Sequence, residues 1–115
     1  MKRLPPLVAQ AASSALEKKA EAVLALDLRS VADFTDFFLL LTGNNQRQLV
    51  AIADAVTESL RGSGRRPVHV EGYPRHEWIL LDYGDFVVHV MTPKSRSFYD
   101  LERLWGGSLR LPVTG

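Results

Sequence analysis

Residues 77–91 read Glu77-Trp78-Ile79-Leu80-Leu81-Asp82-Tyr83-Gly84-Asp85-Phe86-Val87-Val88-His89-Val90-Met91, and the rest of the chain is organised around them. Two runs rich in β-forming residues flank a Gly-Asp pair, a pattern typical of a hairpin with a two-residue turn. This turn length sets the register, so one face of the hairpin should carry Ile79, Leu81, Tyr83, Phe86, Val88 and Val90. That face is wholly apolar, and we expect it to belong to the core.

The other face of the hairpin mixes large apolar side chains with ionisable ones. Its opposed pairs should be Trp78 with Met91, Leu80 with His89, and Asp82 with Val87. A tryptophan and a methionine beside ionisable groups favour a docking surface for another macromolecule. On periodicity alone, a covering helix or a second copy of the chain explains this face equally well.

Length and composition suit one domain of ordinary apolar content. The chain has 115 residues, a formal net charge of +1 and no cysteine, so a disulfide framework, a thiol nucleophile and a zinc-finger spacing are excluded. The near-neutral charge does not indicate a nucleic-acid binder. No segment has the length of a membrane span or the pattern of a signal peptide, and we expect a cytoplasmic protein with no membrane partner.

Charge is unevenly distributed around the hairpin. Between residues 71 and 91 the acidic residues Glu71, Glu77, Asp82 and Asp85 face one strong base, Arg75. This acidic, half-apolar region favours a basic protein as partner over a phosphate backbone.

The remaining chain predicts an α/β (α+β) fold with one five-stranded mixed sheet and flanking helices. Prolines and an alanine-rich run predict a helix over 7–19, and two apolar runs, 22–28 and 35–43, predict strands buried on both sides. A periodic apolar stripe predicts a helix over 45–61 with Asn45 as its N-cap, and 68–71 reads as a short strand. A last helix should begin near a Ser97–Asp100 capping pair and bury Phe98, Leu101, Leu104 and Trp105. The domain should span 1–105, with a loosely ordered tail over 106–115.

Residues that could carry chemistry are few, and we predict no catalytic residue, metal or cofactor. The Gly43-Asn44-Asn45-Gln46 segment lacks a phosphate-loop pattern, and the histidines have no metal-ligand spacing. Two alternatives stay open: an enzyme that uses His89 as a base near Asp82, and an RNA-binding module that uses Arg61, Arg65 and Arg66. Lys94 and Arg96 follow the hairpin and could frame its docking face.

Several motifs, taken together, resemble one known family. They are Thr35-Asp36-Phe37-Phe38, Thr42-Gly43, Arg47-Gln48, Ile52-Ala53-Asp54, Val70-Glu71-Gly72, the hairpin itself, and Phe98-Tyr99-Asp100-Leu101-Glu102-Arg103-Leu104-Trp105. In order and without large gaps over about residues 5–105, the chain is similar to the ribosomal silencing factor family, RsfS, also called Iojap.

The resemblance implies a nucleotidyltransferase-like topology without catalysis, and a protein that binds the large ribosomal subunit. The implied contact is ribosomal protein L fourteen, a basic protein, and the implied effect is a steric block of subunit joining that lowers translation under nutrient limitation. It also implies that Trp78 is the apolar anchor beside Leu80 and Met91, that Glu77, Asp82 and His89 supply polar contacts, and that Lys94 and Arg96 form the rim. A homodimer of the free protein through the same face, and no sequence-specific contact with nucleic acid, are expected.

Overall fold

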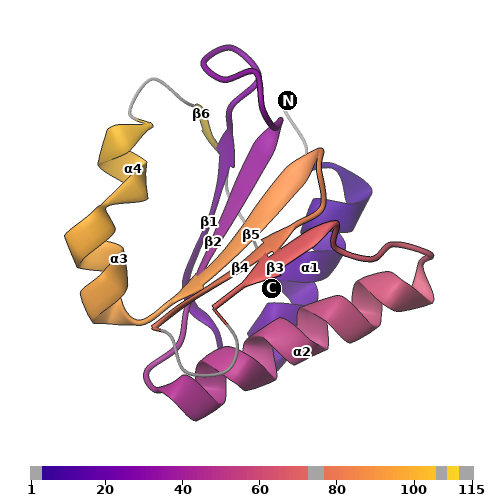
Figure 1. Cartoon of the computed structure of the whole chain (residues 1–115), viewed down its shortest axis with the longest axis vertical. Coiled ribbons are helices and arrows are strands. Elements are labelled where there is room, and N and C mark those ends of the chain that lie inside the picture. The colour runs from indigo at the N-terminus through magenta and orange to yellow at the C-terminus, as the bar shows by residue number, and fades with distance from the viewer. Residues whose placement is uncertain (1–3, 73–76, 106–108, 112–115) are drawn as a thin grey trace.

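The structure is a computed structural model, and it describes residues 4–72, 77–105 and 109–111. Groups of helices and strands follow one another along the chain (Figure 1). The elements are α1 (Pro6–Glu17), β1 (Glu21–Asp27), β2 (Phe37–Thr42), α2 (Gln46–Gly62), β3 (His69–Glu71), β4 (Trp78–Asp82), β5 (Phe86–Met91), α3 (Pro93–Tyr99), α4 (Leu101–Leu104) and β6 (Leu109–Leu111).

Within the described ranges, all strands join one mixed sheet in the order β3-β4-β5-β2-β1-β6. β2 and β5 pair in parallel, whereas the other neighbours are antiparallel. The predicted α/β class with a mixed sheet is therefore confirmed, and the five predicted strands are all present as β1 to β5. The hairpin register is also confirmed, because Trp78 lies opposite Met91, Leu80 opposite His89 and Asp82 opposite Val87.

β6 is an addition to the predicted sheet. It lies in the segment expected to be a loosely ordered tail, and it pairs antiparallel with Ala25–Asp27 of β1. Without it, this edge of β1 would present unpaired backbone N–H and C=O groups, which a short strand satisfies. The rest of the expected tail, residues 106–108 and 112–115, lies outside the described residues.

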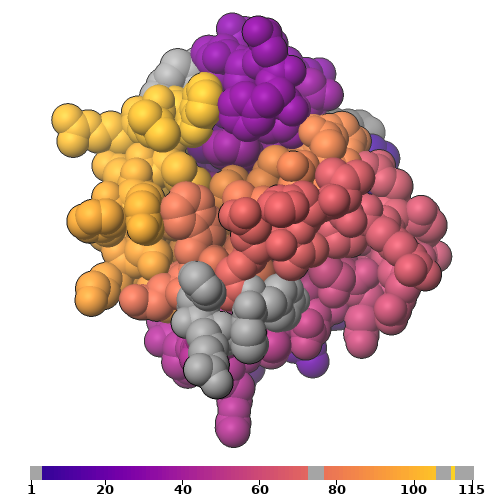
Figure 2. Space-filling view, viewed as in Figure 1, coloured from indigo at the N-terminus to yellow at the C-terminus, as the bar shows by residue number. Residues whose placement is uncertain are grey.

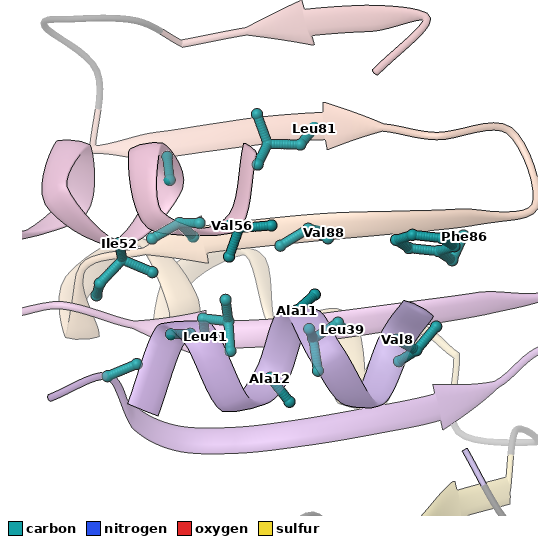
Figure 3. Close-up of a cluster of buried hydrophobic side chains, with 14 of the residues drawn as sticks. Val8, Ala11, Ala12, Leu39, Leu41, Ile52, Val56, Leu81, Phe86 and Val88 are labelled. Carbon is teal, nitrogen blue, oxygen red and sulfur yellow. The ribbon is translucent and has the colours of Figure 1, made fainter. Parts of the chain in front are cut away.

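α1 and α2 cover one face of the sheet, and the main core lies between them and the strands (Figure 3). α1 turns Val8, Ala11, Ala12 and Ala15 inward, and these small residues let the helix pack closely. α2 begins as predicted, with the side chain of Asn45 accepting the backbone N–H of Gln48 at 2.9 Å. The predicted apolar face of the hairpin points into this core.

α3 and α4 lie on the opposite side of the sheet from α1 and α2 (Figure 1). The predicted start of this last helix is wrong, because the N-cap is Thr92, whose hydroxyl oxygen accepts the N–H of Ser95, and Pro93 follows it. A proline suits the first helical turn, where its missing N–H is no loss. Asp100 adopts φ 46°, which ends α3 and turns the chain into α4.

Candidate functional site

The second face of the hairpin is only partly open. The β5 residues Val87, His89 and Met91 are 6%, 3% and 1% exposed. Val87 and Met91 belong to a second, smaller core in which Leu26, Leu28, Phe38, Leu40 and Leu101 also lie. The His89 ring packs against one member of this core, Phe38, with ring centroids 4.4 Å apart. The expectation that His89 and Met91 contact a partner directly is therefore wrong in this structure, since both side chains lie beneath the surface.

The β4 half of the same face remains accessible. Trp78, Leu80 and Asp82 are half-buried and Glu77 is exposed. Between β4 and α3 runs a groove of about 620 Å³, which is lined by Glu71, Gly72, Glu77, Trp78, Leu80, Ser95 and Tyr99. β3–β4 and α3 both reach the surface that faces the viewer in Figure 2. We call these lining residues the docking groove.

The Trp78 side chain in the docking groove is held by a hydrogen bond and a ring contact. Its indole N–H donates to Nδ1 of His89 at 3.0 Å, and its ring lies 4.6 Å from that of Tyr99 between centroids. Gly72, directly after β3, lies close to the Trp78 backbone, because a Cβ at this position would lie 2.0 Å from the carbonyl oxygen of Trp78. The side chain of Trp78 is thus held on two sides, and its backbone leaves no room for a side chain at position 72.

The groove has an acidic rim. Glu71 pairs with His69 of the same strand at 3.0 Å, and both side chains remain mostly exposed. Glu77 accepts the hydroxyl of Thr92 at 3.1 Å, which joins the start of β4 to the start of α3. Aromatic rings beside carboxylates can receive a cationic side chain, because the ring face and the carboxylates both attract positive charge.

The pair proposed for general-base chemistry is not assembled. Asp82 accepts the backbone N–H of Gly84 at 2.8 Å and so supports the hairpin turn. Burial lowers the pKa of His89 to about 3, which leaves its imidazole neutral and hidden from solvent. A general base must reach its substrate and bind a proton near the working pH, and His89 does neither.

The two cations predicted for the rim have different environments. Lys94 is exposed on α3, beside Ser95 of the docking groove. The Arg96 side chain is only 12% exposed. It donates to the carbonyl oxygen of Ala22, to the hydroxyl oxygen of Thr42 at 2.9 Å and to the carboxylate of Glu102 at 3.4 Å. Arg96 therefore joins α3 to β1 and β2, and the prediction that it lies on the rim is wrong.

Sequence reasoning missed an apolar patch on the outer surface of α3 and α4. Phe98, Tyr99 and Leu104 are 79%, 50% and 69% exposed, whereas Phe98 and Leu104 were expected to be buried. The turn at Asp100 breaks the helical periodicity on which that expectation rested. One signal was available: Phe98 and Tyr99 are consecutive, so one helix cannot bury both on the same face.

Other kinds of site receive no support from the residues that the structure describes. In those ranges no group of three or more His, Cys, Asp or Glu side chains could hold a metal ion. Within the same ranges, no helix has the length and hydropathy needed to cross a membrane. Arg65, one of the three arginines considered for RNA binding, is engaged within the protein. Its guanidinium donates to the carboxylate of Asp85 at 2.6 Å and to the carbonyl oxygen of Tyr83 at 2.8 Å.

Comparison with known proteins gives consistent matches along the whole chain. Residues 1–114 match the family model described as "Ribosomal silencing factor during starvation". A ribosomal silencing factor from Halalkalibacterium halodurans is 38% identical to this chain, over 86% of this chain and 85% of its own length. One from Bacillus subtilis is 40% identical to this chain, over 84% of this chain and 81% of its own length. A crystal structure of a Chromobacterium violaceum protein matches with a TM-score of 0.86 and 32% identity, covering 99% of this chain and 95% of that one.

Proposed function

The chain belongs to the ribosomal silencing factor family, and from this premise we propose that it binds the large ribosomal subunit through ribosomal protein L fourteen. Bound there, it sterically prevents the small subunit from joining and represses translation under nutrient limitation. The family is one of regulatory proteins rather than enzymes. The proposed place of action is the cytoplasm.

The observation that carries this proposal is the docking groove with its acidic rim. Trp78 and Tyr99 offer aromatic surface, and Glu71 and Glu77 offer negative charge beside it. Such a combination complements a basic protein and would repel a phosphate backbone. It is also the arrangement from which interface anchors are usually built, with an aromatic residue at the centre and charges around it.

The proposed roles of the side chains follow from their exposure. Trp78 is the anchor with Leu80 beside it, and Glu77, Asp82 and Lys94 make polar contacts at the edges. Phe98 and Tyr99 extend the apolar contact over α3. His89, Met91 and Arg96 are enclosed by the fold, so their proposed role is to support the docking groove from within the protein. When no ribosome is present, the same surface is proposed to pair with a second copy of the chain.

A steric mechanism needs affinity and bulk but no reaction. The molecule measures 34 × 33 × 26 Å along its principal axes. A rigid body of this size, seated on a surface that a second particle must approach closely, leaves no room for direct contact. The silencing effect should then follow the fraction of large subunits occupied.

The decisive experiment is co-sedimentation with separated ribosomal subunits, followed by a light-scattering assay of subunit joining. Wild-type protein should travel with large subunits only and slow joining. Trp78→Ala should weaken binding by about 2 kcal/mol or more, roughly thirtyfold, because a truncated aromatic anchor loses that much. Phe34→Ala is the matched control, since Phe34 is an exposed aromatic residue outside the docking groove, packed near Trp105.

Each outcome has a clear reading. Loss of binding in Trp78→Ala but not in Phe34→Ala supports docking through the groove. Equal binding by both variants refutes the proposed surface. If the wild type stays at the top of the gradient, binding to the large subunit itself is refuted.

A further inference from the structure

We propose that His89 is a positioning residue, which holds the Trp78 ring in the orientation that the partner recognises. This inference rests on the proposed function in one respect, namely that Trp78 is the anchor of the docking surface. The hydrogen bond and ring contacts described next carry it.

The two side chains meet diagonally across the hairpin. Trp78 lies opposite Met91 and His89 lies opposite Leu80, so Trp78 and His89 are neighbours two residues out of register on the same face. Aromatic side chains can span this diagonal. The indole N–H donates to Nδ1 of His89 at 3.0 Å, and the ring centroids are 5.7 Å apart.

This bond uses the one donor that an indole possesses. With its N–H directed inward at His89, Trp78 presents only carbon atoms to the docking groove. The partner then meets an apolar aromatic surface, and any hydrogen bonds must come from the rim. The orientation of the ring therefore sets what kind of contact the anchor makes.

His89 is itself fixed and keeps one protonation state. Its side chain is buried, and its ring lies 4.4 Å from that of Phe38 in an edge-on contact. Because burial lowers the pKa of His89 to about 3, Nδ1 remains an acceptor at any physiological pH. Since Nδ1 accepts the indole proton, the proton of the neutral imidazole lies on Nε2.

Nε2 of His89 has no hydrogen-bond partner among the described residues. A buried donor without a partner destabilises a fold, and an apolar side chain would fill this place without that penalty. For folding alone, histidine is thus a poor choice here. Its advantage is Nδ1, which is directed at Trp78.

Tyr99 completes the support from the side of α3. Its ring lies 4.6 Å from that of Trp78, so the indole is bonded on one side and packed on another. A side chain held in its bound orientation before the partner arrives loses less entropy on binding. The arrangement thus strengthens docking without adding a contact to the partner.

The test compares His89→Leu with His89→Asn. Leucine is apolar and has no acceptor, whereas the Asn side-chain oxygen occupies about the place of Nδ1. In a Trp105→Phe background, the single indole N–H signal in a nitrogen-15 NMR spectrum belongs to Trp78. Its solvent exchange, the urea midpoint and the affinity for large subunits are measured for each variant.

We expect His89→Leu to expose the indole N–H to exchange and to weaken binding about tenfold, while its urea midpoint is unchanged or higher. A role in packing alone would move stability and binding in the same direction. His89→Asn should retain the slow exchange and bind within about threefold of wild type.

Two results would overturn the proposal: wild-type affinity in His89→Leu despite a fast-exchanging indole, or equal losses of binding in both variants. If His89→Leu fails to fold, His89→Asn still decides, because fast indole exchange in a folded, normally binding Asn variant contradicts the role. If wild type itself does not bind large subunits, the proposed function fails, and the exchange data alone then report whether His89 holds Trp78.

Discussion

At the scale of single residues, Gly72 illustrates how the backbone positions the docking groove. It has φ 96°, and a Cβ would meet the carbonyl oxygen of Trp78 at 2.0 Å. We expect Gly72→Ala to destabilise the fold on the order of 3 kcal/mol, since left-handed strain and a backbone clash add. Urea denaturation measures this loss.

Gly64 provides the matched control for that substitution. Its φ is 83°, and a Cβ there would have nothing within 4 Å. Gly64→Ala therefore carries the conformational strain without the clash, and about 1 kcal/mol is expected. If the two variants lose equal stability, the close approach of Gly72 to Trp78 has no energetic importance.

His89 predicts a pH dependence of stability. Its pKa is about 3 in the folded protein and 6.5 without the fold, so the unfolded chain binds the proton more readily. The stability linked to this group is complete above pH 6.5 and falls as the pH decreases towards 3. Between pH 6.5 and 5 the loss should be about 2 kcal/mol.

The comparison needed is between wild type and His89→Leu, each unfolded in urea at pH 7 and at pH 5. The variant should lose less stability on acidification, because leucine does not titrate. Identical pH dependence in the two proteins would show that His89 is not the group responsible.

At the scale of elements, Arg96 holds α3 and α4 against the sheet. It bonds the carbonyl oxygen of Ala22, which has φ 48° in an irregular part of β1, as well as Thr42 and Glu102. Arg96→Ala should destabilise the protein by about 2 kcal/mol, since hydrogen bonds from a charged, mostly buried donor are lost. Lys94→Ala, on the exposed part of the same helix, should change stability by less than about 0.5 kcal/mol.

Urea denaturation of the two variants separates these effects, and amide exchange of β1 locates them. Protection should decrease around Ala22 in Arg96→Ala only. Unchanged protection there, with stability equal to that of Lys94→Ala, would contradict the role assigned to Arg96.

The elements differ in how far the sequence predicts them. The hairpin register was predictable because a two-residue turn and strict alternation leave one pairing. The burial of His89 and Met91 was not predictable, because it depends on strand order. β5 lies beside β2, and both faces of β2 are buried. The doubly apolar pattern of β2 already indicated a covered second face. No local pattern, however, indicates that β5 shares it.

The same reasoning explains which residues of the predicted docking face are accessible. Trp78, Leu80, Glu77 and Asp82 lie on β4 or at its start, near the open edge of the sheet, where the alternation alone gives the accessible face. Tyr99 and Phe98 were missed because their direction depends on where α3 begins and on the backbone turn at Asp100. Arg96 was wrongly predicted to lie on the rim for a similar reason, since its hydrogen-bond partners Ala22 and Thr42 are distant in sequence.

At the scale of the whole molecule, the two faces of the sheet are covered differently. α1 and α2 close one face, and α3 lies on the opposite face (Figure 1). The docking groove lies beside α3 on that opposite face. A charge change therefore should matter on one face and not on the other. Glu71 and Glu58 allow this test, because both are exposed acids, one in the groove and one on α2.

Glu71→Lys should weaken binding to the large subunit roughly tenfold at low salt, because a basic partner then meets a like charge. Glu58→Lys changes the net charge equally and should leave the affinity within about twofold, since α2 lies on the far face. The difference should shrink as salt rises from about 0.05 to 0.5 M, because exposed charges are screened. Equal losses in both variants would mean that net charge, rather than the acidic rim of the groove, steers the protein to the ribosome.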